Sequence, residues 1–145
     1  MNPIPIALRR AAPVLLALAL AACASGGGTP GATPEELVKK RSAERWQFLI
    51  DRKPEQAWDY LSAGVRSTQS REAYAQEMKL RPVHWLTVEP LDAECVKARC
   101  DLRTRLEYEI TIPGTGSGPT RAPAYVYERW IEVDGAWYFV PKEFQ

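Results

Sequence analysis

The chain has 145 residues, and its 19 lysine and arginine residues nearly balance its 18 aspartate and glutamate residues. This length suffices for one domain with one hydrophobic core. A formal net charge of +1 provides no basic surface of the kind that binds nucleic acid, so the composition argues against a nucleic-acid-binding protein.

The first 22 residues are typical of a secretory signal peptide. Arg9 and Arg10 supply a short positive region, and an almost unbroken apolar run follows from residue 11 to residue 22. This run of about a dozen residues is shorter than the roughly 20 that span a bilayer, which favours a signal segment over a transmembrane helix. A buried core helix is the alternative, but the arginine pair and the small residues at the end of the run favour the signal peptide.

The residues Leu20-Ala21-Ala22-Cys23 resemble the lipobox of bacterial lipoproteins. The resemblance implies cleavage before Cys23 and acylation of that cysteine, so that its lipid enters a bilayer. Several acyl chains anchor a protein stably in the bilayer, because each buried methylene contributes about 0.8 kcal/mol. A single chain gives only marginal membrane binding. Residues 23–33 are rich in glycine and small polar residues and are predicted to be a flexible tether. Ala24 follows the cysteine in place of an aspartate, which by the same resemblance implies an outer-membrane lipoprotein facing the periplasm.

A long helix opens the folded domain, which is predicted to cover residues 34–145. Thr33 can cap the free amides of the first turn, and Pro34 suits the first helical position. The helix is expected to run to about Asp51. Its predicted buried face consists of Val38, Ser42, Ala43, Trp46, Leu49 and Ile50.

Two shorter helices are predicted next. The second helix starts at Pro54, and its buried set is Ala57, Trp58 and Leu61. Residues 62–69 are predicted to be a loop. Ser70 caps a third helix, which ends before Pro82 because the residue preceding a proline avoids the helical conformation.

After the third helix the hydrophobic period changes from 3.6 to 2, which indicates β-strands. Residues 84–88 form the first strand, with Pro90 at an edge position or a bulge. Apolar and charged residues then alternate from residue 100 to residue 112, which predicts a long strand with one buried face. Two strands, 124–133 and 136–140, complete the chain and are joined by its best hairpin signal, Asp134-Gly135.

Cys95 and Cys100 are the two cysteines that lipidation would leave, and an even pair in an oxidising compartment predicts a disulfide. If Lys97-Ala98 were a two-residue turn, the cysteines would face each other with Cα atoms about 4.5 Å apart, within disulfide range. Lys-Ala is a poor dipeptide for such a turn, so a four-residue loop closed by the bridge is equally compatible. Redox catalysis is disfavoured because it prefers Cys-x-x-Cys spacing.

Two segments of the sequence are informative about the fold. The first follows the long helix and reads Ala-Trp-Asp-Tyr-Leu-Ser at 57–62, and the second lies near the end of the domain and reads Arg-Trp-Ile-Glu-Val-Asp-Gly-Ala-Trp-Tyr at 129–138. With the order of elements, they resemble the cone-shaped superfamily of ketosteroid isomerase, scytalone dehydratase and nuclear transport factor over residues 33–143. The resemblance implies a curved sheet that wraps the first helix and leaves a pocket at its wide end. The expected fold class is therefore α+β, with three N-terminal helices packed on a curved four-stranded antiparallel sheet.

The sequence contains no evident catalytic constellation. An enzyme of this fold would place a carboxylate or histidine inside the apolar cone, where burial raises the pKa of a carboxylate. His84 is the only histidine, and a structural or exposed role is favoured for it. No Cys/His cluster has the spacing of a metal site, and no cofactor is expected.

Aromatic residues are the remaining functional signal. On strand 124–133, Tyr125 and Tyr127 share one face, while Val126 and Glu128 share the other. Either face can contribute to a pocket or a partner surface, for which the candidates are Trp58, Tyr60, Tyr108, Tyr127, Arg129 and Trp130. The predicted function is non-catalytic binding of another envelope protein or a small apolar ligand. The alternative is a small isomerase, dehydratase or hydrolase that uses the cone pocket.

Overall fold

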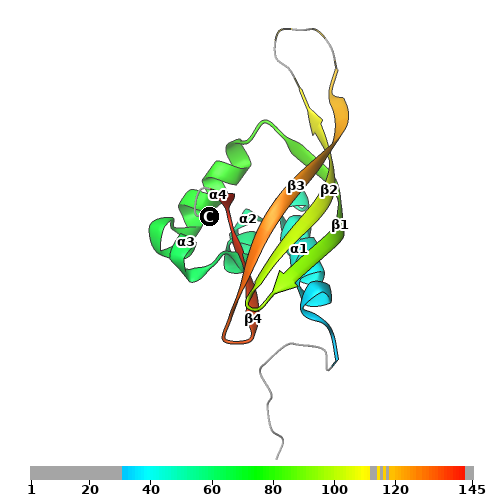
Figure 1. Cartoon of the computed structure of the whole chain (residues 1–145). Helices are drawn as coiled ribbons and strands as arrows, with labels where there is room; N and C mark the ends of the chain where they lie inside the picture. Colours follow the sequence, from blue (N-terminus) through cyan, green and yellow to red (C-terminus); the bar gives the residue numbers. More distant parts are fainter. Residues whose placement is uncertain (1–30, 112–113, 115, 117, 143–145) are drawn as a thin grey trace, which may run out of the picture.

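The computed structural model describes residues 31–111, 114, 116 and 118–142. The predicted signal peptide, the lipidation site Cys23 and most of the tether lie outside the described residues. Helices come first and a four-stranded antiparallel sheet follows, so the predicted α+β class is confirmed (Figure 1).

The first helix, α1 (Pro34–Ile50), begins and ends almost where the sequence predicts. Thr33 and Glu36 form a reciprocal cap, in which each side chain accepts a hydrogen bond from the backbone N–H of the other. Four of the six residues predicted for the buried face are fully buried: Val38, Ser42, Trp46 and Leu49. Arg45 is buried with them, which the hydrophobic pattern did not predict.

Short helical segments follow α1 and complete one layer of the molecule. They are α2 (Pro54–Ala57), the 3-10 helix η1 (Trp58–Tyr60), α3 (Ala63–Thr68) and α4 (Arg71–Leu80). The Ser70 hydroxyl accepts a hydrogen bond of 3.2 Å from the Ala73 N–H, which confirms the predicted cap of α4. The isolated bridge between Leu61 and Phe139 links this layer to the last strand.

The prediction of a loop over residues 62–69 was wrong, because α3 lies there. Gly64 and the surrounding hydroxyl residues have low helix propensity, so the sequence did not indicate a helix here. Ser62 is extended, and its carbonyl accepts a 3.0 Å hydrogen bond from the Arg66 N–H. Val65 is 2% exposed, so burial in the core stabilises this short helix in spite of its propensity.

The sheet has the order β1-β2-β3-β4, with β1 (His84–Val96), β2 (Arg99–Ile110), β3 (Thr120–Val133) and β4 (Ala136–Val140). The edge strand β1 continues through Pro90, since an edge strand can accommodate a residue without an N–H. Its register with β2 shifts twice, between Trp85 and Thr87 and between Pro90 and Ala93. β3 starts earlier in the chain than the alternation predicted.

Tight turns join β1 to β2 and β3 to β4. Cys95 and Cys100 are paired in register and form the predicted disulfide, with Cα atoms 4.1 Å apart across the two-residue turn Lys97-Ala98. Asp134 and Gly135 both have positive φ, 51° and 77°, as the predicted hairpin turn requires.

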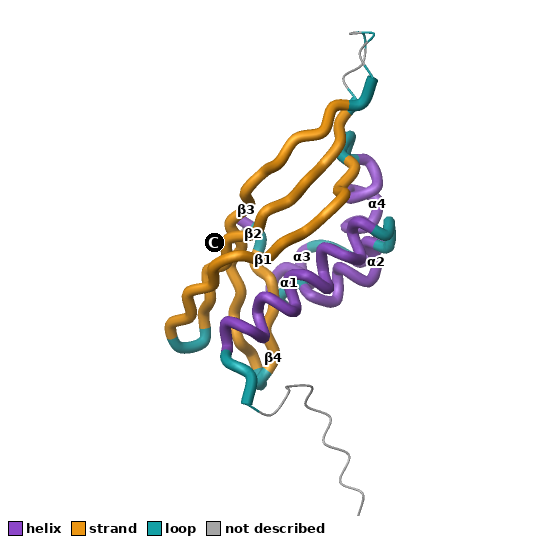
Figure 2. The backbone as a smooth tube through the Cα atoms, turned by 90° about the vertical axis from the view of Figure 1, so that its right-hand side faces the viewer, coloured by secondary structure: helices purple, strands orange, loops and turns teal. Residues whose placement is uncertain are grey.

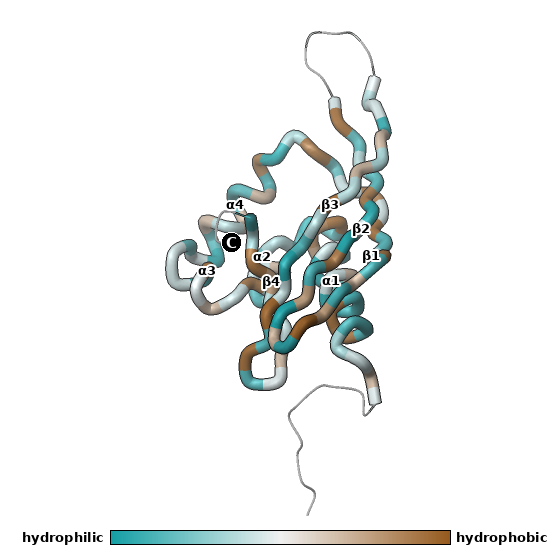
Figure 3. The backbone as a smooth tube through the Cα atoms, in the orientation of Figure 1, coloured by the Kyte–Doolittle hydropathy of each residue, from teal (hydrophilic) through white to brown (hydrophobic). Residues whose placement is uncertain are grey.

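The helices cover one face of the sheet, and the opposite face is exposed to solvent (Figure 2). Hydrophobic and hydrophilic residues alternate along the strands, which matches this one-sided burial (Figure 3). The side chains of β2 that face the helices are almost fully buried: Cys100, Leu102, Thr104 and Leu106. The layer of helices and the inner face of the sheet therefore enclose the core.

Candidate functional site

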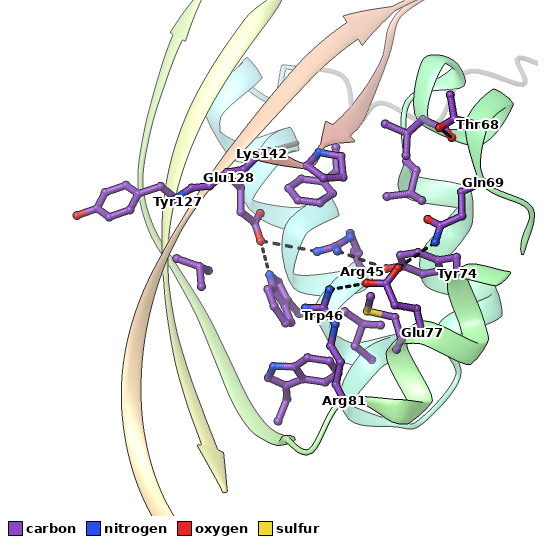
Figure 4. Close-up of a pocket in the computed structure, with 18 of the residues that line it drawn as sticks. Arg45, Trp46, Thr68, Gln69, Tyr74, Glu77, Arg81, Tyr127, Glu128 and Lys142 are labelled. Carbon is purple, nitrogen blue, oxygen red and sulfur yellow. Dashed lines mark hydrogen bonds and ion pairs between the residues drawn. The ribbon is translucent and has the colours of Figure 1, made fainter. Parts of the chain in front are cut away.

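A cavity of about 790 Å³ lies between the helices and the inner face of β3 and β4 (Figure 4). This volume is in the usual range for sites that bind small molecules, about 300–1,000 Å³. Slightly more than half of its wall is apolar, and the apolar or aromatic side chains in it include Trp46, Leu49, Leu61, Val65, Tyr74, Met78, Trp85, Val126 and Phe139.

Glu128 on β3 is a buried carboxylate in the wall of the cavity, and its residue is only 3% exposed. One oxygen accepts hydrogen bonds from the Ser42 hydroxyl at 2.7 Å and from the Trp130 indole N–H at 2.9 Å. The other oxygen accepts a short hydrogen bond from the Trp46 indole N–H. Ser42 and Trp46 are four residues apart on α1 and therefore reach the same carboxylate from one helix face.

Arg45, also on α1, is the second buried ionisable residue of the wall and is 5% exposed. Its Nη1 lies 3.9 Å from a Glu128 oxygen, so the two charges compensate each other. Its guanidinium lies 4.0 Å from the centre of the Phe139 ring, which favours a buried cation through a cation–π contact. In Figure 4 the Arg45 side chain points into the space between Glu128 on the sheet and Tyr74 on α4.

The guanidinium of Arg45 is only partly hydrogen-bonded. Nη2 donates to the Tyr74 hydroxyl at 3.4 Å, which is a long hydrogen bond. Nε and Nη1 are buried and have no hydrogen-bond partner among the described residues. Two of the three guanidinium nitrogens therefore have no acceptor within the described part of the chain.

A second polar cluster in the lining connects α3 to α4. The Glu77 carboxylate accepts a hydrogen bond of 2.7 Å from Arg81 and one of 2.9 Å from the Gln69 side chain. Both bonds favour the charged form, Arg81 more strongly, and hold the pKa of Glu77 below its usual value. Lys142 adds an exposed cation to the lining.

Three of the predicted site residues, Tyr127, Arg129 and Trp130, lie on β3. Tyr127 belongs to the lining, but the residue is 63% exposed and its ring points away from the cavity in Figure 4. Arg129 lies on the outer face and donates to Asp101. Trp130 is fully buried and supports the site indirectly, through its hydrogen bond to Glu128.

The other three predicted site residues, Trp58, Tyr60 and Tyr108, do not line the cavity. The Trp58 indole donates to the Gln69 carbonyl at 3.2 Å. The Tyr60 hydroxyl donates to the Glu44 carboxylate at 3.1 Å, and burial, followed by the Glu44 charge, raises the pKa of Tyr60. Through these bonds Trp58 and Tyr60 link η1 to the end of α3 and to α1, whereas Tyr108 lies on β2 between Trp85 and Ala122 of the neighbouring strands.

Sequence reasoning missed Arg45 and Glu128 as site residues, although a signal was present. Glu128 alternates with Val126 and Trp130 on the apolar face of its strand. Arg45 follows Val38 by two helical turns and so lies on the buried face of α1. A carboxylate and a guanidinium on two faces that must pack together are candidates for a buried pair.

The described residues provide neither a metal centre nor a membrane span. Within them, no group of three histidine, cysteine, aspartate or glutamate side chains could hold a metal ion. His84 is exposed at the first residue of β1. The helices in the described ranges are too short or too polar to cross a bilayer.

No protein-family model and no curated protein matches the sequence. Solved structures are similar in fold at low identity. A SEC-C motif containing protein from Rhodopseudomonas palustris has a TM-score of 0.55 and 12% identity, over 70% of this chain and 73% of that chain. Another from Psychrobacter arcticus has a TM-score of 0.56 and 13% identity, over 79% of this chain and 64% of that chain, which is less than two thirds of its length.

A protein from Novosphingobium aromaticivorans, provisionally named a scytalone dehydratase, has a TM-score of 0.52 and 12% identity, over 71% of this chain and 76% of that chain. At identities this low, the similarity of the structures concerns the fold and carries no information on activity. Together with the helices that cover one face of an antiparallel sheet and the cavity between them, this similarity shows that this chain shares the α+β fold of these structures, the cone-like arrangement expected from the sequence.

Proposed function

We propose that this protein is a membrane-tethered lipoprotein of the cell envelope whose cone domain binds a small, largely apolar ligand without catalysing a reaction. The observation that carries this proposal is the cavity of about 790 Å³ with its apolar and aromatic wall. Apolar ligand surface that leaves water for such a wall is stabilised by about 25 cal/mol per Å². A concave site of this size suits a small molecule better than the surface of a partner protein.

The state of Glu128 argues against the alternative of a small isomerase, dehydratase or hydrolase. A general base must come within hydrogen-bond reach of the proton that it removes. Both oxygens of Glu128 already accept hydrogen bonds, from Ser42, Trp46 and Trp130. The carboxylate is therefore bound as a structural group that connects α1 to β3.

Ligand binding is tested by calorimetric titration of 1-octanol into the full chain in phosphatidylcholine nanodiscs, with the heats of empty nanodiscs subtracted. Val126→Phe fills part of the cavity, and we expect it to weaken binding about tenfold, the equivalent of ~1.4 kcal/mol. Val133→Phe is the matched control, because Val133 is on the same strand, is 45% exposed and lies outside the lining. Equal affinity of the two variants, or no heat beyond that of empty nanodiscs, would overturn the proposal.

Membrane tethering is tested separately at Cys23. The proposal rests on the lipobox resemblance and on the tether-like composition of residues 23–33. In cells supplied with radiolabelled palmitate, we expect label in the wild-type protein and in Ser25→Ala, and none in Cys23→Ala. Label that persists in Cys23→Ala would rule out acylation at this residue while leaving the cavity proposal untouched.

A further inference from the structure

The buried guanidinium of Arg45 defines the chemistry that the cavity selects. A guanidinium carries five N–H donors and no acceptor. Nε and Nη1 are without a hydrogen-bond partner among the described residues, and Nη2 has only the 3.4 Å contact with Tyr74. Arg45 therefore places buried donors without an acceptor in the wall of the cavity, where an acceptor on a ligand would satisfy them.

Glu128 compensates the charge of Arg45 without satisfying its donors. The shortest separation between the pair, 3.9 Å from Nη1 to Oε1, is beyond hydrogen-bond distance. Meanwhile, both carboxylate oxygens are bound by neutral donors of α1 and β3. Because Glu128 is held in place by those bonds, the acceptor that Arg45 lacks has to come from elsewhere.

The charge of the lining favours an anionic acceptor. The lining contains three cations, Arg45, Arg81 and Lys142, and two carboxylates, Glu77 and Glu128. Glu77 is already bound by Arg81 and Gln69. Arg45 is compensated by Glu128, so the one positive charge in excess is that of the exposed Lys142, and it favours an anionic ligand over a cationic one.

We propose that the ligand is an amphipathic monoanion of the carboxylate class, whose head group accepts hydrogen bonds from Arg45 and whose apolar chain lies along the aromatic wall. This inference rests on the proposed ligand-binding function. Phe139 and Trp46 flank the guanidinium, at 4.0 and 5.2 Å from their ring centres, so the charged head and the apolar wall are adjacent. Planar guanidinium donors are suited to the planar carboxylate.

The test compares three eight-carbon probes with different head groups: octanoate, 1-octanol and octylammonium. Each is titrated calorimetrically into the full chain in phosphatidylcholine nanodiscs at neutral pH, with empty-nanodisc heats subtracted. For the wild-type chain we expect octanoate to bind about tenfold more tightly than 1-octanol, and octylammonium to bind most weakly, because charge-assisted hydrogen bonds are the strongest kind.

Arg45→Met is expected to reduce the affinity for octanoate to that for 1-octanol, while 1-octanol binding changes by less than about twofold. Arg103→Met is the matched control, since it removes the same charge from an exposed residue that pairs with Asp92 outside the lining. The ranking of the three probes on the wild-type chain needs no variant and stands even if Arg45→Met folds poorly.

The failures of the two proposals are distinguishable. Equal affinity of octanoate and 1-octanol, or tighter binding of octylammonium, would overturn the anionic head group and leave the ligand-binding function intact. Equal loss of octanoate binding in Arg45→Met and Arg103→Met would assign the preference to overall charge and would also overturn it. Absence of binding by all three probes would overturn both proposals.

Discussion

At the scale of single residues, the domain depends on a polar cluster inside its apolar core. Glu128 and Arg45 are both buried, and a lone buried charge would cost several kcal/mol. Three neutral donors and the nearby guanidinium remove most of that cost for Glu128. Two nitrogens of Arg45 have no hydrogen-bond acceptor among the described residues. The hydrogen bonding of the cluster is therefore satisfied for the carboxylate and only partly satisfied for the guanidinium.

Removal of the Glu128 carboxylate is therefore expected to be strongly destabilising. Glu128→Ala leaves Arg45 without its counter-charge and leaves three buried donors without an acceptor, which should lower the free energy of unfolding by about 3–5 kcal/mol. Asp101→Ala is the control, because it removes an exposed carboxylate that pairs with Arg129 and Arg99 and should cost at most about 1 kcal/mol. Equilibrium urea unfolding of the full chain measures both. Similar losses in the two variants would show that the buried cluster does not stabilise the fold.

At the scale of secondary-structure elements, the β1–β2 hairpin combines a disulfide with an unfavourable turn. Lys97 has a φ of 55°, a conformation that disfavours a side chain, whereas Ala98 next to it is not among the described residues with positive φ. The bridge between Cys95 and Cys100 closes a small ring and contributes about 2 kcal/mol by restricting the unfolded chain. The covalent link therefore holds a hairpin whose turn residues do not favour it.

This turn yields a pair of opposite predictions. Lys97→Gly removes the steric penalty of positive φ and should raise the free energy of unfolding by about 0.5–1 kcal/mol. Ala98→Gly, in the same turn, should lower it by about 0.4–1 kcal/mol, because glycine only adds freedom to the unfolded chain there. Urea unfolding under non-reducing conditions compares the two variants with the wild type. A loss of stability in Lys97→Gly would contradict the assigned turn conformation.

The elements that the sequence predicted correctly are those with strong local signals. α1 has a proline and a capping threonine, β2 alternates over its whole length, and Asp134-Gly135 specifies its own turn. The helix α3 was missed because its stability comes from the burial of Val65 and not from local propensity. β1 was predicted too short, but the predicted edge position or bulge at Pro90 is confirmed, because β1 is an edge strand and its register with β2 shifts between Pro90 and Ala93.

The site was less predictable than the fold. Helical and strand periodicity predict that Arg45 and Glu128 lie on the buried faces of their elements. They do not predict that the two side chains lie close to each other in the folded domain. Ser42 and Glu128 are 86 residues apart in the chain, and the way α1 lies on the sheet is set by the packing of many side chains. The aromatic residues on the outer face of β3 were conspicuous in sequence, whereas the cavity lies behind that face.

At the scale of the whole molecule, the first described residues and the cavity are connected through α1. The helix begins beside the end of the molecule that carries the β3–β4 turn, whereas β2 ends and β3 begins at the opposite end (Figures 1 and 2). The same helix contributes Arg45, Trp46 and Leu49 to the cavity. A tether attached before α1 would therefore hold the molecule by the element that also forms the site.

The central claim is that a ligand occupies the cavity between the helices and the sheet, and its position can be measured directly. Nuclear Overhauser effects are recorded between the chain of bound octanoate and the methyl groups of the full-length protein, in nanodiscs of deuterated lipid. Contacts with Leu49, Met78 and Val126 are expected, since all three line the cavity, and none with the exposed Val133. Contacts confined to Val133, or the absence of any contact with the three lining residues, would contradict the claim.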